Sequence, residues 1–430
     1  MSAPQSSAIQ YDILIIGGGL VGASLAACLA RDASLRIGVV EKFPPPQDSG
    51  DFHPSYDARN TALANGTCHI FELLGVWREL RVHAVPIATI EITNQGRFGR
   101  AVIRAAEERV RALGYVIENR WIGKVLYRHL QACTNVDFRA PAEVVALRYE
   151  VDTVVATLDN QQQVRTPLVI IADGALSHTR QMLGIGATVT DYEQVAIVTA
   201  VTPDKPHNNI ALERFTDTGP LAILPQTDNR LGLTWCVDKT AADELMAADD
   251  ATFLRALEKA AGEGIGRLEK VGKRFSYPLS LTLAEEQIRP NVVVLGNAAH
   301  GLHPVAGQGF NMAMRDVAVL VQVLCAAREQ NRHWGEFNLL QQYLRQRGQD
   351  QFNTIQFSDK LTHLFSNRNP LLSVLRNSGL VLFDTMQGTK RFVARYAMGR
   401  AVSTRLPDIA NTAANAGTNN ANVELKQVTP

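Results

Sequence analysis

The 430-residue sequence lacks the features of several specialised protein classes. Its formal net charge is only +1, and it has no basic patch interleaved with aromatic residues, so nucleic-acid binding is not expected. No run reaches the roughly 18 apolar residues of a membrane span, because the longest candidate, near residues 317–327, is short and interrupted. The first residues also lack the basic and apolar regions of a signal peptide.

Cysteine is scarce and never closely paired. This spacing argues against a disulfide framework and against a zinc site. It favours a reducing compartment, and we expect a cytoplasmic protein. The five cysteines are Cys28, Cys68, Cys133, Cys236 and Cys325.

The pattern that is present predicts an α/β protein of several units. At about 150 residues per domain, the length predicts roughly two or three units. Residues 11–41 follow the order strand, glycine turn, helix, strand, and residues 168–172 and 292–295 are further apolar strands. Such strands indicate a parallel sheet covered on both faces. Residues 191–282 instead alternate as antiparallel strands do, with one helix near 241–261.

We therefore predict a Rossmann-like dinucleotide-binding domain, an inserted antiparallel β-sheet domain for the substrate and a C-terminal helical region. A helix is expected over residues 62–80. The predicted boundaries assign residues 8–80, 119–185 and 286–330 to the dinucleotide-binding domain, 81–118 and 186–285 to the substrate domain, 331–405 to the helical region, and 406–430 to a disordered tail.

The first glycine motif, Gly17-x-Gly19-x-x-Gly22, follows a predicted strand and opens a predicted helix. Glycines here permit a tight turn and a close approach to a pyrophosphate at the helix N-terminus. Glu41 ends the next strand, where a carboxylate can accept hydrogen bonds from ribose hydroxyls. The alternative is a glycine-rich packing turn, but the two strands and Glu41 favour dinucleotide binding.

Two more polar or glycine-rich turns follow buried strands. Asp173-Gly174-x-x-Ser177-x-x-Arg180 follows residues 168–172, and a run beginning at Gly296 follows residues 292–295. FAD is long enough to need contacts at its ribityl chain and ring, and these strand ends could supply them. The alternative for the Asp173 motif is a surface turn with solvated Ser177 and Arg180.

Together the three motifs resemble those of the FAD-dependent aromatic hydroxylases of the para-hydroxybenzoate hydroxylase group. Within that group the chain is similar to the UbiH branch, in the UbiH/COQ6 family of ubiquinone biosynthesis. The likeness runs from about residue 10 to about residue 400. The segments that carry it within the branch are residues 59–63, 213–216, 219–222, 303–311, 364–367 and 379–380.

The resemblance implies roles for single residues. Glu41 would hold the adenosine ribose, and Arg59 would lie near FAD. Asp173 and Gly174 would serve both FAD and a transient nicotinamide cofactor. Gly296 and Asn297 would hold the ribityl chain. The residues implied beside the flavin ring are Pro304, Gly307, Gln308, Gly309 and Asn311.

Asn297 departs from the wider group, which usually has Asp at this position. Asn can bond a ribityl hydroxyl but carries no charge, which predicts a weaker contact. The same substitution is familiar in the ubiquinone branch, so Asn297 favours that branch over the rest of the group.

The resemblance also implies an activity. NADPH or NADH would reduce FAD, and the reduced flavin would use dioxygen to hydroxylate a polyprenylated phenol. The implied substrate is a 2-polyprenyl-6-methoxyphenol, hydroxylated para to its hydroxyl, at ring carbon C1. Hydroxylation at another ring carbon or of a soluble phenol stays open, as does a non-catalytic flavoprotein scaffold. The sequence does not single out a catalytic base.

Two further features of the sequence bear on metal binding and on membrane contact. His300 and His303 are three residues apart, but no third ligand follows at metal-site spacing, so no metal is predicted. Residues 331–400 carry ten Lys/Arg against four Asp/Glu, alongside apolar clusters. Around residues 361–400 this composition suggests contact with anionic lipid at the inner face of the membrane, or with a biosynthetic assembly. An ordinary helical cap on the FAD domain is the alternative.

Overall fold

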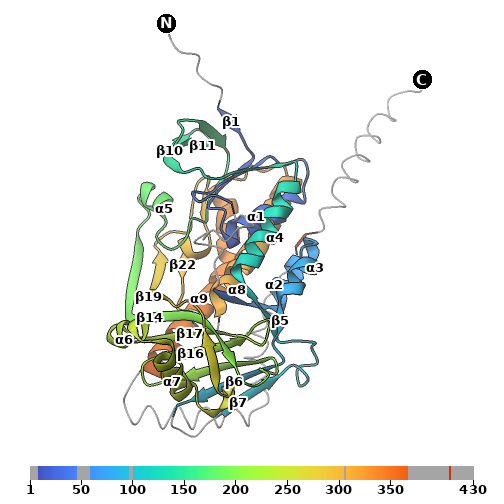
Figure 1. Cartoon of the computed structure of the whole chain (residues 1–430). Coiled ribbons are helices and arrows are strands. Elements are labelled where there is room, and N and C mark those ends of the chain that lie inside the picture. Colours follow the sequence, from blue (N-terminus) through green and yellow to red (C-terminus); the bar gives the residue numbers. More distant parts are fainter. Residues whose placement is uncertain (1–7, 46–58, 96–99, 305–306, 367–405, 408–430) are drawn as a thin grey trace, which may run out of the picture.

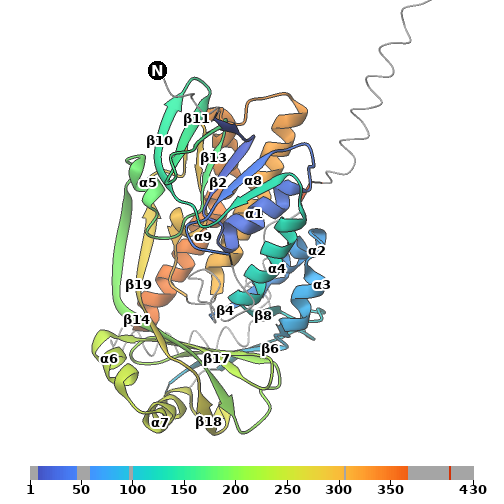
Figure 2. The same cartoon turned by 45° about the horizontal axis from the view of Figure 1, so that its top comes forward.

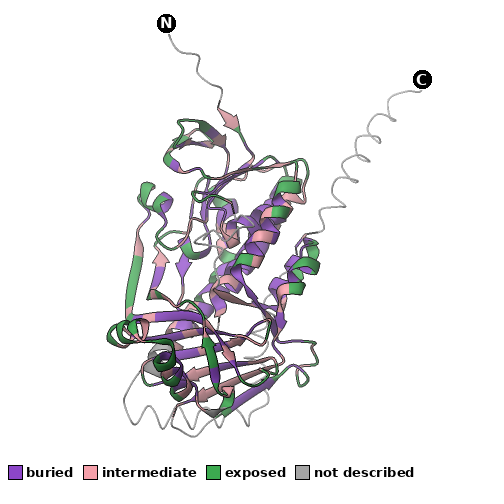
Figure 3. Cartoon of the chain, viewed as in Figure 1, coloured by how far each residue is buried: buried purple, intermediate pink, exposed green. Residues whose placement is uncertain are grey.

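The computed structural model describes residues 8–45, 59–95, 100–304, 307–366 and 406–407. The described residues form two sheet-containing halves, shown one above the other in Figure 1. The long strands β14 (Ala187–Pro203) and β19 (Phe275–Ala284) run from one half to the other (Figure 1). In Figure 3 the strands at the centre of the upper half are buried, whereas the first part of β14, where it runs between the halves, is largely exposed.

A six-stranded sheet forms the centre of the upper half. All its pairings are parallel except that of β20 with β21. The strands predicted near residues 11–16, 36–41, 168–172 and 292–295 are confirmed as neighbours in this sheet. In spatial order the strands are β20 (Ile288–Arg289), β21 (Val292–Val294), β13 (Val169–Ile171), β2 (Ile13–Ile16), β3 (Ile37–Val40) and β9 (Val136–Arg139).

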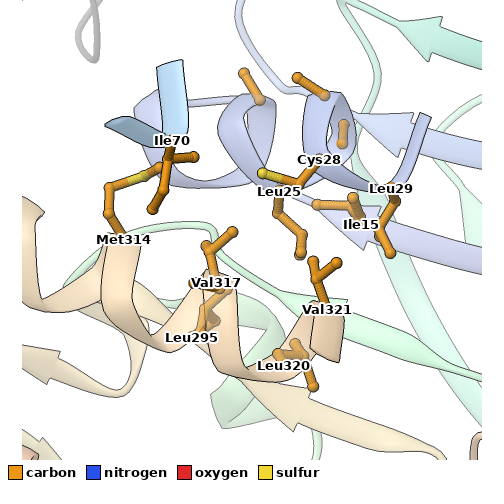
Figure 4. Close-up of a cluster of buried hydrophobic side chains, with 14 of the residues drawn as sticks. Ile15, Leu25, Cys28, Leu29, Ile70, Leu295, Met314, Val317, Leu320 and Val321 are labelled. Carbon is orange, nitrogen blue, oxygen red and sulfur yellow. The ribbon is translucent and has the colours of Figure 1, made fainter. Parts of the chain in front are cut away.

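The two faces of this sheet are covered differently. On one face, α1 (Leu20–Ala30), α4 (Asn119–Ala132) and α8 (Gln308–Glu329) build one apolar core, in which Leu25 points toward Val317 and Val321 (Figure 4). On the other face lies an antiparallel meander with one parallel edge strand. The meander consists of β1 (Ile9–Gln10), β12 (Gln163–Thr166), β11 (Thr153–Leu158) and β10 (Val144–Glu150).

A nine-stranded sheet forms the lower half. Its outer face is covered by α6 (Lys239–Ala247) and α7 (Asp250–Ala261), seen below the sheet in Figure 2. The sequence predicted one helix here, but the chain breaks because the Asp249 carboxylate accepts a hydrogen bond from the Thr252 N–H and caps a second helix. Besides β14 and β19, the strands are β22 (His300–Gly301), β17 (Leu231–Asp238), β16 (Pro220–Pro225), β15 (Ile210–Phe215), β6 (Thr89–Asn94), β7 (Arg100–Arg104) and β18 (Leu268–Val271).

The helix predicted over residues 62–80 is wrong at its start. Asn60–Ala64 is strand β4, which pairs with β8 (Gly114–Glu118), and β8 also pairs with β5 (Val85–Pro86). Only α2 (Asn65–Leu73) and the short α3 (Trp77–Leu80) are helical. A distant strand supplies the hydrogen bonds that override local helical pattern. This small sheet joins residues from both predicted domains, whose boundaries stay predictions.

Of the last two described helices, α9 crosses between the halves and α8 packs within the upper one. α8 is long and apolar enough to span a membrane by length and composition, but 78% of its most apolar stretch is buried inside the protein. The helix α9 (Phe337–Ser366) contacts both β20 and β16. The predicted tail beyond residue 407 and most of the basic segment at 361–400 lie outside the described residues.

Candidate functional site

The three predicted motifs leave the same edge of the six-stranded sheet. Ile16 pairs with Ile171, and Ile171 pairs with Val294, so β2, β13 and β21 end side by side. The loops that follow at Gly17, Asp173 and Gly296 therefore begin next to one another. Ligands of open α/β sheets bind outside the carboxyl ends of the strands, which is where these loops lie.

The first motif requires glycine at positions 17 and 22, because other backbone atoms lie too close to leave room for a Cβ. At Gly22 a Cβ would lie 1.9 Å from the carbonyl oxygen of Gly17, and at Gly17 it would lie 2.4 Å from the Ala172 oxygen. Gly17 also has a φ of +102°, which favours glycine. Gly19 begins α1, and no side chain caps that helix. The N–H groups of the first turn are thus available for a phosphate.

Glu41 lies directly behind this turn and is buried. Its carboxylate accepts hydrogen bonds from the N–H of Gly18 at 2.7 Å and of Phe43 at 2.9 Å. Burial raises the pKa of Glu41, although these N–H bonds oppose the rise. Gly18 was not among the predicted site residues, yet a Cβ there would lie 2.6 Å from the Phe138 ring. The glycine run itself was the signal for it.

The Asp173–Arg180 motif connects the loop after β13 to the loop after β21. The Asp173 Oδ2 accepts a hydrogen bond from the Thr179 N–H, while its buried Oδ1 has no hydrogen bond from the described residues. Ser177 caps α5 (His178–Met182) and is buried, as is Arg180. Arg180 donates to the carbonyl of Ala298 at 2.6 Å. Neither residue is solvated, so the alternative of a plain surface turn is wrong.

The third motif approaches the first. Gly296 has a φ of +63°, and a Cβ there would lie 3.2 Å from the Val21 side chain in the first turn of α1. Asn297 is exposed between buried neighbours, which leaves its amide accessible to a ligand. Gly174, with a φ of +93°, has open space where a side chain would stand. The site accordingly has room along the line from Gly17 to Asn297.

The run around Gly307 starts α8. Gly307 is left-handed, with a φ of +58°, and no side chain caps the helix. The Asn311 amide is fully occupied inside the protein, because it bonds Ala64, Thr67, Ala62 and Gly307. If Asn311 contacts a flavin it must do so through its backbone. Gln308 is buried, and Pro304 and Gly309 are partly exposed. The predicted contacts of this run with FAD stay predictions.

A cavity of about 290 Å³ lies between the two halves. Arg59 contributes one wall, and its guanidinium lies 5.1 Å from the ring centroid of Tyr277. The opposite wall is the inner face of β14 and β19, where Val198 and Phe275 provide apolar surface. Arg59 therefore stands at the junction of the halves.

The two histidines have separate protein partners. The Nε2 of His300 lies 3.1 Å from the Asp316 carboxylate, and both are buried. The Nε2 of His303 lies 3.3 Å from the Gln194 Oε1 and its ring meets that of Tyr192 edge-on. Among the described residues no group of three metal-ligating side chains occurs. Gln194 was not predicted from the sequence.

Burial of His303 predicts a pH-dependent stability. Burial lowers the pKa of His303 from 6.5 to about 4, so the folded state holds the neutral ring. Stability is then complete above about pH 6.5 and falls until about pH 4, by about 3 kcal/mol. His303→Asn should flatten the fall of Tm over this range relative to the wild type, both saturated with FAD. Equal slopes for the two proteins would rule the prediction out.

Comparisons with known proteins agree with this geometry. The model of the FAD-binding domain family matches residues 10–358. Ubiquinone hydroxylase UbiL of Rhodospirillum rubrum is 36% identical over 90% of this chain and 89% of its own. The 3-demethoxyubiquinol 3-hydroxylase of Escherichia coli is 32% identical over 90% of this chain and 98% of its own. This chain belongs to the UbiH/COQ6-type FAD-dependent aromatic hydroxylases.

A solved structure confirms the predicted fold of this hydroxylase. The p-nitrophenol 4-monooxygenase PnpA of Pseudomonas putida superimposes with a TM-score of 0.75, covering 92% of this chain and 99% of PnpA at 17% identity. The predicted Rossmann-like domain with an antiparallel substrate sheet is thus confirmed. The enzyme is a flavin-dependent aromatic monooxygenase acting in ubiquinone biosynthesis.

The site fits FAD. The glycine cradle at Gly17–Gly22, the uncapped start of α1 and the buried Glu41 suit the pyrophosphate and ribose. The orphaned Asp173 Oδ1 and the exposed Asn297 are free to receive hydroxyls further along the cofactor. FAD, when bound, supplies the redox chemistry of oxygen activation. The protein supplies position, and the strands β14 and β19 supply one wall of the cavity.

Proposed function

We propose that this hydroxylase uses NADPH or NADH as the reductant of FAD and hydroxylates a 2-polyprenyl-6-methoxyphenol at C1. The observation that carries the proposal is the cavity between Arg59 and the apolar inner face of β14 and β19, below the strand ends that suit FAD. An apolar wall suits a ring and prenyl tail, and the basic lining residues Arg59, Arg120, Arg230 and Lys273 suit a phenolic oxygen. Asp173 and Gly174 would also contact the nicotinamide during reduction.

A second candidate is hydroxylation at another carbon of the same ring. The Escherichia coli relative is named a 3-demethoxyubiquinol 3-hydroxylase, and that relative covers nearly the whole chain. The floor of the cavity does not by itself select one ring carbon. The position attacked therefore has to be read from the product.

The test is single-turnover product mapping. The flavoprotein would be reduced with NADPH without oxygen in the presence of a short-chain 2-prenyl-6-methoxyphenol, then mixed with oxygen. We expect a product heavier by one oxygen atom, with the new hydroxyl at C1 by NMR. A demethoxyubiquinol analogue and an unprenylated phenol, treated identically, are the controls for the other ring carbon and for a soluble substrate.

The outcomes separate the alternatives. Product only from the demethoxyubiquinol analogue would favour the second candidate. Equal turnover of the unprenylated phenol would favour a soluble substrate. Oxygen consumption without any oxygenated ring would contradict hydroxylation. A scaffold would show no substrate-stimulated NADPH oxidation. Parallel runs with NADH identify the preferred reductant.

We also propose a cytoplasmic protein in peripheral contact with the inner face of the membrane or with a biosynthetic assembly, which would bring it to a lipid-borne substrate. Support comes from the basic composition of residues 361–400. Part of the wider basic excess is used internally, because Arg347 is buried between Asp316 and Asp350. Full-length protein should sediment with anionic liposomes at low salt and leave them at high salt. Failure to bind at low salt would remove the lipid version.

A further inference from the structure

The inner face of the nine-stranded sheet carries one acidic side chain without an evident structural task, Glu213. Along β15 the residues alternate between faces. Leu212 joins the apolar core under α6 and α7, and Ala211 joins a cluster with Ile103 and Val116 on the side of the FAD domain. Since side chains two residues apart share a face, Glu213 faces the FAD domain as Ala211 does.

Strand register connects Glu213 to the cavity. Glu213 is directly opposite Ala222, which is opposite Thr234, which is opposite Val198. Residues directly opposite one another lie on the same face, and Val198 lines the cavity. The row spans three strand spacings of about 4.8 Å. The intervening Ala222 and Thr234 have short side chains and are partly exposed, so no bulky residue stands in this row between Val198 and Glu213.

The start of α8 is connected to this face of the sheet through Ala62. Ala62 packs against the cluster that contains Ala211, and the Cβ of Ala62 lies 3.5 Å from the position that a Gly307 Cβ would occupy. Ala62 therefore links the segment that the family resemblance places beside the flavin ring to the cluster next to Glu213 on β15.

Glu213 is partly buried, and one oxygen of its carboxylate lacks a partner among the described residues. Its Oε1 is inaccessible to solvent and receives no hydrogen bond from the residues that the structure describes. Burial raises the pKa of Glu213 to about 7. Buried polar atoms are normally paired, so the unpaired Oε1 indicates a donor that arrives with the ligand.

We propose that Glu213 is a catalytic residue, which binds the phenolic hydroxyl of the substrate and takes its proton. The O–H bond of the phenol breaks, an O–H bond to the carboxylate forms, and the electron pair stays on the phenolate oxygen. That negative charge spreads to the ring carbons ortho and para to the oxygen, which makes them better nucleophiles toward the oxygen that is transferred. This assignment rests on the proposed phenol substrate.

The choice of residue type also suits the task. A carboxylate whose pKa lies near the working pH can both accept a proton and return it when the product leaves. It is a stronger acceptor than an amide or hydroxyl, because a charge-assisted hydrogen bond is about twice as strong as a neutral one. The three residues opposite and beside it, Ala222, Ile92 and Ala211, offer no competing donor side chain.

The experiment compares Glu213→Gln and Glu213→Asp with the wild-type FAD enzyme. The control is Glu269→Gln, which changes an exposed glutamate on β18 of the same sheet. A short-chain 2-prenyl-6-methoxyphenol is bound without reductant, and its phenolate absorbance is followed against pH. Wild type and control should ionise the bound probe at lower pH than free probe, whereas Glu213→Gln should hold it as the neutral phenol.

Turnover supplies the second readout. In Glu213→Gln we expect product formation to fall on the order of 10²–10⁴-fold, while NADPH oxidation continues and yields hydrogen peroxide. Glu213→Asp should recover part of the rate and keep a titrating group in the pH profile. Unchanged FAD content and Tm in each variant show that the fold is intact. These readouts distinguish proton transfer from a structural role.

Two results would overturn the assignment. One is wild-type protein that ionises the bound probe at the same pH as free probe, which needs no variant. The other is Glu213→Gln with wild-type product yield and pH profile. If wild-type protein forms no oxygenated phenol at all, the proposed function fails first and the assignment falls with it. If wild type forms the product and Glu213→Gln behaves as wild type does, only the assignment of Glu213 is contradicted.

Discussion

Gly22→Ala should release FAD from the purified protein, although it adds only one methyl group. A Cβ at Gly22 would stand 1.9 Å from the carbonyl oxygen of Gly17, and that backbone atom cannot rotate away. The start of α1 would have to move off the turn that suits the pyrophosphate. Overpacking of this kind costs about 1–3 kcal/mol, which corresponds to on the order of a ten- to hundredfold rise in the FAD Kd. Flavin absorbance per protein, and titration of the apoprotein with FAD, measure it.

Gly348→Ala is the matched control for this prediction. Gly348 lies inside α9, and the space that its Cβ would occupy has no atom within 4 Å. Alanine there should leave FAD binding unchanged and add up to about 1 kcal/mol of stability, because glycine is a poor helix former. If Gly22→Ala retained FAD as the wild type and Gly348→Ala do, the proposed cradle at Gly17–Gly22 would be wrong.

Among single substitutions in the first half of α9, Arg347→Met should be the most destabilising. Arg347 is completely buried, with its Nε 2.6 Å from Asp316 and its Nη2 2.5 Å from Asp350. Burial opposes ionisation of Asp316, yet His300 and Arg347 hold the pKa of that carboxyl below its ordinary value. Removing the guanidinium leaves buried carboxylates short of positive charge, which costs roughly 3–5 kcal/mol.

The measurement is thermal and chemical unfolding of the FAD-loaded protein. Arg345→Met, on the same helix but exposed, is the control and should change stability by less than about 0.5 kcal/mol. Arg315 would remain beside Asp350 at 2.8 Å, so Asp316 should lose more support than Asp350. A second substitution, Asp316→Asn, should therefore recover part of the loss in Arg347→Met. Additive losses in the double variant would show that the two side chains are not coupled.

Local pattern was sufficient for the dinucleotide half of the site. The glycines at positions 17, 19 and 22 lie between two apolar strands, and Glu41 ends the second of them. Everything that this unit needs is encoded within about thirty neighbouring residues. Even Gly18 could have been chosen, because the run of three glycines already pointed to close packing. The family resemblance then extended the prediction to Asp173 and Gly296.

Local pattern failed where distant strands decided the outcome. Residues 60–64 have a sequence compatible with a helix, but pairing with residues 114–118 makes them a strand. The hydrogen bonds of the Asn311 amide to Ala64 and Thr67 were also not foreseen, while its predicted place beside the flavin stays a prediction. His303 meets Gln194 from a strand more than a hundred residues earlier. The spacing of residues along the sequence does not reveal such contacts.

Glu213 is the clearest case of a candidate site residue that the local sequence could not identify. From the sequence alone it is one residue in a family-like segment, and no base could be chosen. Its partial burial, the lack of a hydrogen bond to its Oε1 from the described residues and its row toward Val198 all depend on strands β6, β16 and β17 pairing around β15.

The sequence by itself determined the cofactor, the family and the strand-turn-helix units, because these depend on neighbouring residues and backbone conformation. Only the tertiary structure decided which side chains meet below the cofactor. Unmet hydrogen bonds arise when strands far apart in the chain pack together, and the unmet bond at Oε1 is what distinguishes Glu213 from the other glutamates that the structure describes.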